Sequence, residues 1–180
     1  MIDFEYLVDA ALNGGADRAV LISTEQVVVD NRVRLKCRVP ICKNYNHCLM
    51  CPPNTLTVDE FRGLLSQYSQ ALLLQIKAKG RSQADIIETE LQVQNLITDL
   101  ETKALMAGNY FVAGFGAAHC RLCPECVGVH SKKQCKHPFR ARPSMEAVGI
   151  DMYQTSANSG IPVNLLDPEE LYFAGLLLLC

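Results

Sequence analysis

The sequence predicts an α/β or α+β fold: a small central β-sheet flanked by helices, with two cysteine-rich metal-binding loops. Three observations support this. Amphipathic helical stretches alternate with short apolar runs typical of strands. The chain is 49% apolar and 20% charged, which is typical of folded globular proteins. Eight of the nine cysteines fall in two groups whose spacing has neither helical nor strand periodicity. A chain of 180 residues suffices for one core, so we expect a single domain over residues 1–180.

The first third of the chain predicts a helix, two strands and a second helix. Residues 3–13 carry an apolar helical face, and Gly14-Gly15 ends that helix. Residues 18–23 form the apolar run of a short buried strand. Residues 26–35 are rich in valine and alternate in polarity at their end, which predicts a second strand leading into the first cysteines. The capping box over residues 57–60 predicts the start of the next helix.

The remaining elements follow the same alternation. Residues 71–76 are apolar throughout, as expected of a central strand, and a long helix then runs from Ser82 to about Met106. A strand over residues 110–116 leads into the second cysteine group. If the strands on either side of the long helix pair in parallel, their connection should be right-handed. The later expectations are a helix start at 143–144, a short helix over 152–157, a helix start or turn at 167–170 and a final strand over 172–179.

The second cysteine group is the most specific motif of the chain. Cys120, Cys123 and Cys126 are spaced as C-x2-C-x2-C, Cys135 follows after eight residues, and Pro138 lies three residues further. The first three positions match the bacterial ferredoxin pattern, in which closely spaced thiolates hold successive corners of a [4Fe–4S] cluster. Structural zinc more often uses two separated pairs of ligands. The spacing therefore favours an iron–sulfur cluster over zinc.

The first cysteine group is less regular. It consists of Cys37, Cys42, Cys48 and Cys51, followed by Pro52-Pro53, and its composition predicts a loop. The loop suits a tetrahedral zinc ion or a second cluster. An alternative set is Cys37, Cys42 and Cys51 with an outside ligand, and His47 is a further candidate donor. Cys180 stands alone at the terminus and is not expected to bind metal.

The expected cellular compartment favours metal binding by the cysteines over disulfide formation. The N-terminus is acidic and has no basic stretch ahead of an apolar one, so we expect no secretory signal and a cytoplasmic location. The apolar run over residues 171–180 is too short to span a membrane.

Positive charge gathers around both cysteine groups although the chain carries a net charge of −2. An anionic metal–thiolate site is stabilised by nearby cations, and a basic rim suits an acidic protein redox partner or, equally, an anionic substrate. The basic residues lack interleaved aromatics, which argues against nucleic acid. Eleven of the 17 Lys and Arg residues are involved: Arg32, Arg34, Lys36, Arg38, Lys43, Arg121, Lys132, Lys133, Lys136, Arg140 and Arg142.

These motifs together resemble those of the DUF2284 family of predicted metal-binding prokaryotic proteins, over about residues 19–179. The resemblance is carried by Cys37…Cys42…Tyr45…Cys51-Pro-Pro, by the Cys120–Cys135 motif and by Arg142-Pro-Ser-Met-Glu-Ala-Val-Gly-Ile-Asp151. It implies metal binding without a specific reaction. The last segment suggests a helix start beside the metal loop, where Arg142, Glu146 and Asp151 could line a substrate or partner site.

The leading functional hypothesis is an iron–sulfur protein with one or two [4Fe–4S] clusters that passes electrons to a partner redox enzyme. One cluster would be held by the Cys120 group and the second by the Cys37 group. The alternatives are a zinc-binding structural or interaction module, with nucleic acid as one partner, and an enzyme whose cluster has an open coordination position. No nucleophile–base pair, Walker loop or dinucleotide motif is visible, so enzymatic activity and oligomeric state are left open.

Overall fold

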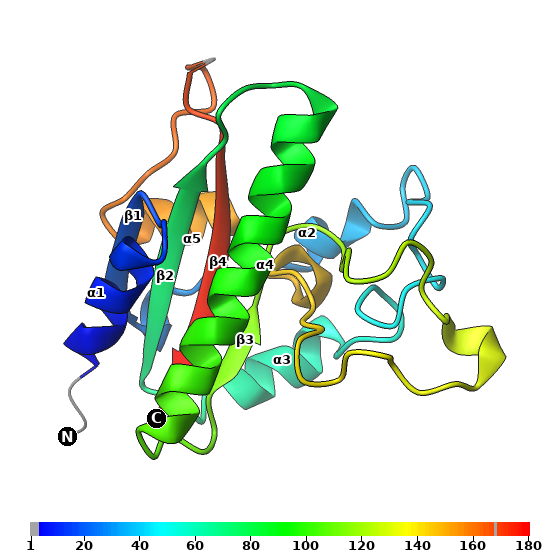
Figure 1. Ribbon diagram of the computed structural model, residues 1–180, viewed down its shortest axis with the longest axis horizontal. Helices are drawn as coiled ribbons and strands as arrows, with labels where there is room; N and C mark the ends of the chain where they lie inside the picture. Colours follow the sequence, from blue (N-terminus) through cyan, green and yellow to red (C-terminus); the bar gives the residue numbers. More distant parts are fainter. Residues whose placement is uncertain (1–3, 168) are drawn as a thin grey trace.

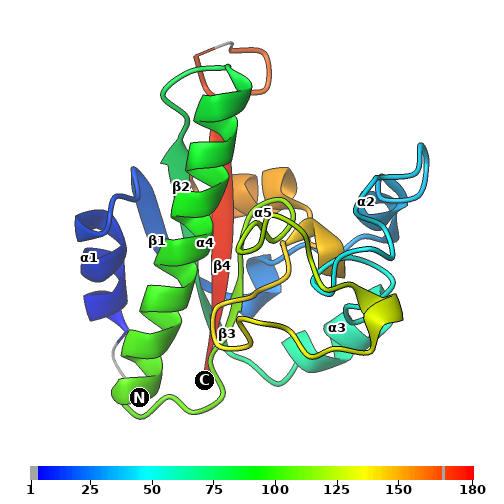
Figure 2. The same cartoon turned by 45° about the vertical axis from the view of Figure 1, so that its right-hand side comes forward.

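The computed structural model describes residues 4–167 and 169–180, which fold into a four-stranded sheet with helices on both faces (Figures 1 and 2). The strand order is β1-β2-β4-β3, and every neighbouring pair is antiparallel. This arrangement confirms the mixed α/β class and the small central sheet. The strands are β1 (Arg18–Ser23), β2 (Gln70–Lys77), β3 (Ala113–Phe115) and β4 (Tyr172–Leu179).

Five α-helices and three short 3-10 helices accompany the sheet in the described residues. The bounds of α1, β1, the long α4, α5 and β4 agree with the sequence prediction to within about two residues. The α-helices are α1 (Glu5–Asn13), α2 (Asn31–Leu35), α3 (Val58–Leu65), α4 (Gln83–Met106) and α5 (Met152–Asn158), and the 3-10 helices are η1 (Thr24–Gln26), η2 (Val129–Ser131) and η3 (Glu146–Val148).

The sheet separates two hydrophobic cores. Alternate side chains of β2 point to opposite faces, because successive residues of a strand alternate in direction. Leu72 and Leu74 pack with α1 and α4 on one face, whereas Leu73 packs on the other with Phe61 of α3 and the chain around η3 and α5. Both faces are covered, which explains why β2 is apolar almost throughout. The central position predicted for this strand is confirmed.

Strand β4 lies between the two strands that α4 connects. The antiparallel pairing of β4 with both β2 and β3 makes those two strands parallel to each other but not adjacent. The C-terminal strand fills the gap, so the β2–α4–β3 unit is a split crossover and not a directly paired one. The strands on either side of α4 are therefore parallel, as the sequence analysis allowed, although they do not pair with each other.

The strand predicted over residues 26–35 is wrong. Residues 24–26 form η1, and residues 31–35 form α2. Asp30 caps α2, because its carboxylate accepts a 2.7 Å hydrogen bond from the Arg32 amide. Only one isolated bridge, between Val29 and Ile150, retains a β-type contact in this stretch. The local helix cap at Asp30 thus outweighs the strand tendency of the valine-rich pattern.

Smaller departures occur at three other places. Strand β3 is shorter than predicted, with three residues instead of seven. The helix start at Pro143-Ser144 is only the single turn η3, and Asp167 opens a turn by accepting from the Glu169 amide at 2.8 Å. Pro168, also part of that prediction, lies outside the described residues. Among the described residues, no helix has both the length and the hydrophobicity needed to cross a membrane.

Candidate metal centre

The second cysteine group lies on a long loop that leaves and re-enters the fold at one point. The loop begins after β3, where Gly116 accepts a hydrogen bond from the Met145 amide at 3.0 Å and donates to Pro143 at 2.9 Å. A parallel bridge joins Gly116 to Ser144 at the same place. The stems of the loop over residues 117–142 are therefore pinned together at the sheet edge. The loop then extends to one side of the molecule, as the yellow-green segment in Figure 1 shows.

The first cysteine loop is fastened to the same short segment. Asp30 donates its amide to Gly149 at 2.8 Å, and Asp151 donates to Val28 at 2.8 Å, which fixes the chain before the loop. After the loop, the Thr55 hydroxyl donates to the Ala147 carbonyl at 3.1 Å. Residues 144–151 thus hold the stems of both loops. This is the structural role of the segment that the sequence singled out after Arg142.

Helix α4 supports the second loop through three arginines. Arg121 donates to Glu90 at 2.5 Å, Arg142 donates to Glu101 at 2.6 Å, and Arg140 donates to the Asn95 side chain at 2.6 Å. The two carboxylates are only 9% and 15% exposed. These contacts fix both ends of the loop, so three of the eleven clustered cations stabilise the local structure.

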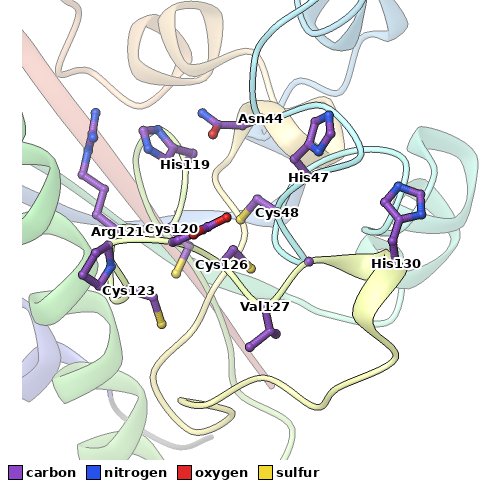
Figure 3. A pocket seen from close by; sticks show the side chains of 13 residues that line it. Asn44, His47, Cys48, His119, Cys120, Arg121, Cys123, Cys126, Val127 and His130 are labelled. Atoms are coloured by element: carbon purple, nitrogen blue, oxygen red, sulfur yellow. The ribbon is translucent and has the colours of Figure 1, made fainter.

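The two loops meet at a cavity of about 500 Å³ (Figure 3). Cys48 of the first loop shares its wall with Cys120, Cys123 and Cys126 of the second. The same four cysteines, now joined by Cys135, line a smaller inner recess of about 20 Å³ behind it. Five cysteines from both predicted groups therefore surround one site. The two cysteine loops thus lie close together in the structure.

The two loops approach each other closely at this site. A Cβ on Gly128, which has a positive φ of 68°, would lie 3.4 Å from the carbonyl oxygen of His47. The rings of His47 and His130 face each other edge to face at 6.4 Å between centroids. His119 and His130 line the cavity although the sequence analysis did not single them out; their closeness to the cysteine triplet was the available signal.

Cys48 connects the two groups electrostatically. It is 4% exposed, and hydrogen bonding from the neighbouring Cys51 lowers the pKa of the Cys48 thiol, with Cys126 contributing in the same direction. The same contact with Cys48, together with burial, raises the pKa of Cys51. These opposite shifts come from side-chain hydrogen bonding between the two thiols. Cys48 therefore touches its own group through Cys51 and the second group through Cys126.

Cys37 and Cys42 face a different cavity, of about 360 Å³. Burial and the nearby Cys42 charge raise the pKa of Cys37, and the charges of both raise that of Cys51. Glu146 and Asp151, two of the three residues expected to line a substrate or partner site, lie on the wall of this cavity. Arg142, the third, is paired with Glu101 instead. The first group is thus divided, with Cys48 turned to one cavity and Cys37 and Cys42 to another.

The described cysteines do not form a preformed site for a single ion. Within residues 4–167 and 169–180, no three Cys, His, Asp or Glu side chains converge closely enough to hold a single metal ion. Five of the thiols nevertheless lie around one recess. The assignment of all eight loop cysteines as ligands stays a prediction. The ninth cysteine, Cys180, is exposed and follows the end of β4.

Burial shifts the pKa values of two candidate donors at this site. Burial raises the pKa of the Cys120 thiol, and burial lowers the pKa of the His119 imidazole, with the Arg121 charge acting in the same direction. Both shifts favour the uncharged forms, a neutral His119 imidazole and a protonated Cys120 thiol. Because metals bind thiolate, loading would release protons and couple the order of the loops to metal binding.

The comparison with known proteins identifies a family for nearly the whole chain. The family model described as "Predicted metal-binding protein (DUF2284)" matches residues 20–179, which contain all eight loop cysteines and the segment that holds the loop stems. No curated protein and no solved structure matches the chain significantly. The chain belongs to the DUF2284 family of predicted metal-binding proteins.

Proposed function

We propose that this protein binds [4Fe–4S] clusters and transfers electrons to a partner redox protein. The observation that carries the proposal is the convergence of Cys48, Cys120, Cys123, Cys126 and Cys135, from two separate loops, around one recess. The C-x2-C-x2-C triplet supplies three thiolates on consecutive corners of a cubane. The fourth ligand is then Cys135, as the spacing predicts, or Cys48.

The surroundings of the recess suit a redox cluster. Leu49, Met50, Leu122 and Val127 line it together with the thiols. Apolar neighbours limit the access of water, and hydrogen bonds to sulfur tune the reduction potential. One such bond is already formed, because the His137 amide donates to Cys135 Sγ at 3.3 Å. The recess thus supplies shielding and a hydrogen-bond donor, both of which affect the potential.

Contribution of the fourth ligand from another loop has a parallel in two-cluster ferredoxins. There, the last cysteine of one motif ligates the other cluster. Cys48 is in the corresponding situation, since it belongs to the first group by sequence and lies on the wall of the second site. We therefore expect the two centres to lie close enough for electrons to pass between them.

The first loop offers the docking surface for the partner. Val39 is 66% exposed and Ile41 is 72% exposed, and Cys42 beside them is also exposed. Among the described residues, Lys36, Arg38 and Lys43 make no ion pair, in contrast to the arginines that bind α4. An apolar centre with unpaired cations around it fits an acidic protein surface. The partner is therefore expected to present carboxylates around an apolar patch.

The proposal is tested on protein purified without oxygen. Dithionite reduction should bleach a brown visible absorption and produce the EPR signal of a reduced [4Fe–4S] cluster. Cys123→Ser should abolish or strongly weaken the signal from the second site, and Cys180→Ser should leave it unchanged because that thiol lies outside both cavities. A colourless protein that shows no EPR signal after reconstitution with iron and sulfide would contradict the proposal.

A further inference from the structure

The inner recess holds one thiol more than a cubane uses. Five cysteines line it: Cys48, Cys120, Cys123, Cys126 and Cys135. A [4Fe–4S] cluster takes four thiolates, one for each iron. The triplet and Cys135 supply four from a single loop, in the order that their spacing predicts. Cys48, which comes from the other loop, is then a thiol beside the cluster and not a ligand of it.

Cys48 has a second thiol as its direct neighbour. Cys48 and Cys51 form a C-x2-C sequence that is folded into a turn, because the Cys51 amide donates to the Cys48 carbonyl at 3.1 Å. The Asn54 side chain donates to the same carbonyl at 3.1 Å. The side chains of the two cysteines hydrogen-bond to each other, and Cys48 also bonds to Cys126. Cys48 therefore lies between a disulfide partner and a cluster ligand.

The two thiols differ in their access to solvent-filled space. Cys48 lies on the wall of the outer cavity of about 500 Å³, where Figure 3 shows it beside the triplet. Cys51 lies on the wall of neither that cavity nor the inner recess. In disulfide oxidoreductases, a C-x2-C sequence carries an attacking thiol and a resolving one. By position, Cys48 is the attacking thiol here and Cys51 the resolving one.

We propose that Cys48 and Cys51 are a redox-active dithiol that exchanges with a low-molecular-weight disulfide in the outer cavity, and that the cluster of the second site reduces it. The inference rests on the cluster of the proposed function. Of the two candidates for the fourth ligand of that cluster, it requires Cys135 and excludes Cys48.

The exchange proceeds in two balanced steps. The Cys48 thiolate attacks one sulfur of the disulfide RSSR, whose S–S bond breaks and releases the first RSH with the proton from Cys48. The Cys51 thiolate then attacks Cys48 Sγ, which forms the Cys48–Cys51 disulfide and releases the second RSH with the proton from Cys51. Two electrons and two protons restore the dithiol. The electrons come singly through the [4Fe–4S]2+/+ couple from a one-electron redox protein, so the sum is RSSR + 2 e− + 2 H+ → 2 RSH.

The outer cavity suits a small polar disulfide. Its volume lies within the ordinary range for ligand sites. The side chains of Asn44, His47, His119 and His130 line it and offer N–H donors. Carboxylate and amide oxygens accept such bonds, so the cavity favours a disulfide that carries these groups. Glutathione disulfide has both and serves as the probe.

Metal content tests the assignment of the fifth thiol. Cys48→Ser should keep the iron and sulfide of the second site, whereas Cys135→Ser should lose them. Loss of the cluster in Cys48→Ser with its retention in Cys135→Ser would overturn the inference and leave the proposed function standing. Absence of iron and sulfide from the wild-type protein would refute both.

Peptide mapping tests the dithiol. Glutathione disulfide is added to protein purified without oxygen, free thiols are alkylated, and peptides are analysed by mass spectrometry. The wild type should show a disulfide between Cys48 and Cys51, and Cys180→Ser, the control, should show the same. Cys51→Ser should instead retain glutathione on Cys48, because the resolving thiol is missing. A wild-type protein in which Cys48 and Cys51 are both alkylated as free thiols would overturn the inference.

Turnover tests the link between the dithiol and the cluster. Reduced methyl viologen is the one-electron donor, and glutathione disulfide is the acceptor. The wild type and Cys180→Ser should oxidise about two viologen radicals per disulfide consumed. Cys48→Ser and Cys51→Ser should lose this turnover, although viologen should still bleach their clusters. Viologen oxidation that both variants sustain at the wild-type rate, or that the wild type does not show, would refute the transfer of electrons from cluster to dithiol.

Discussion

Arg121, within the cysteine triplet, donates through its Nε to Glu90 of α4 at 2.5 Å. The carboxylate is 9% exposed and the guanidinium 26%. The ion pair joins the segment between two candidate ligands directly to the longest helix of the fold. Positive charge near the second cysteine group therefore includes a structural anchor.

Arg121→Ala should lower the free energy of unfolding of the metal-free protein by about 2 kcal/mol, because it leaves the Glu90 charge buried without a partner. Equilibrium unfolding in urea measures the change. Lys79→Ala is the matched control: its pair with Glu88 is 72% and 52% exposed, so we expect a change below about 0.5 kcal/mol. Equal effects of the two substitutions would show that the Arg121 pair does not anchor the loop.

The basic surface of the first loop should accelerate electron transfer to anions. The rate at which the reduced protein reduces ferricyanide should fall as ionic strength rises, because salt screens the attraction between the loop and the anion. The rate should also be lower in an Arg38→Glu, Lys43→Glu double variant than in the wild type, because electrostatic steering toward the loop is lost. Stopped-flow absorbance measures the rates. Lys103→Glu, on the exposed side of α4, is the control and should have the smaller effect. A rate insensitive to salt and to the double substitution would contradict this docking surface.

Close packing of α4 on the sheet predicts a specific cost at Gly175. An added Cβ would lie 2.6 Å from Cγ1 and 2.9 Å from Cδ1 of Ile97, which is fully buried. Gly175→Ala should therefore destabilise the fold by about 1–3 kcal/mol. Gly63→Ala adds a Cβ with no atom within 4 Å on the exposed side of α3, and it should stabilise by about 0.5–1 kcal/mol. Thermal unfolding of both variants tests the difference, and a neutral Gly175→Ala would contradict the packing.

The cap of α2 should make part of the stability depend on pH. The Arg32 side chain and amide hydrogen-bond Asp30 and lower the pKa of its carboxyl to about 2. Because the folded pKa is depressed, this stabilisation is complete above the unfolded value of about 3.9 and is lost as pH falls toward 2. Asn also caps helices well, so Asp30→Asn removes mainly the charge. Urea midpoints should differ between the two proteins at pH 6 and converge near pH 2; a constant difference would exclude the ion pair as its cause.

The sequence predicted the elements whose periodicity and end signals agree. The capping boxes at Thr57 and Ser82 mark the starts of α3 and α4 because their side chains bond the backbone three residues on, a purely local interaction. Residues 26–35 failed because the Asp30 cap competes with a valine-rich pattern, and both signals are weak in isolation. The position of β4 between β2 and β3 is decided by contacts across the whole chain, which no local pattern reveals.

The arrangement of the candidate site likewise depends on long-range contacts that no local sequence pattern reveals. Spacing along the chain identified the cysteines that lie in loops, and it assigned them to two groups of four. The structure places Cys48 with the second group because residues 144–151 hold both loop stems side by side. That juxtaposition depends on hydrogen bonds between segments about 90 to 120 residues apart, such as Thr55 to Ala147. The burial of Glu146 Oε2, which makes no hydrogen bond to a described residue, also became visible only in the structure.

The most direct test of the central claim is the iron and acid-labile sulfide content of protein purified without oxygen. We expect iron and sulfide in equal amounts, about four of each per chain for one cluster and about eight for two. We also expect Cys126→Ser to remove about half of both from a two-cluster protein, whereas Cys180→Ser should remove none. Stoichiometric zinc without sulfide, retained after anaerobic reconstitution with iron, would contradict the account and identify the loops as zinc sites.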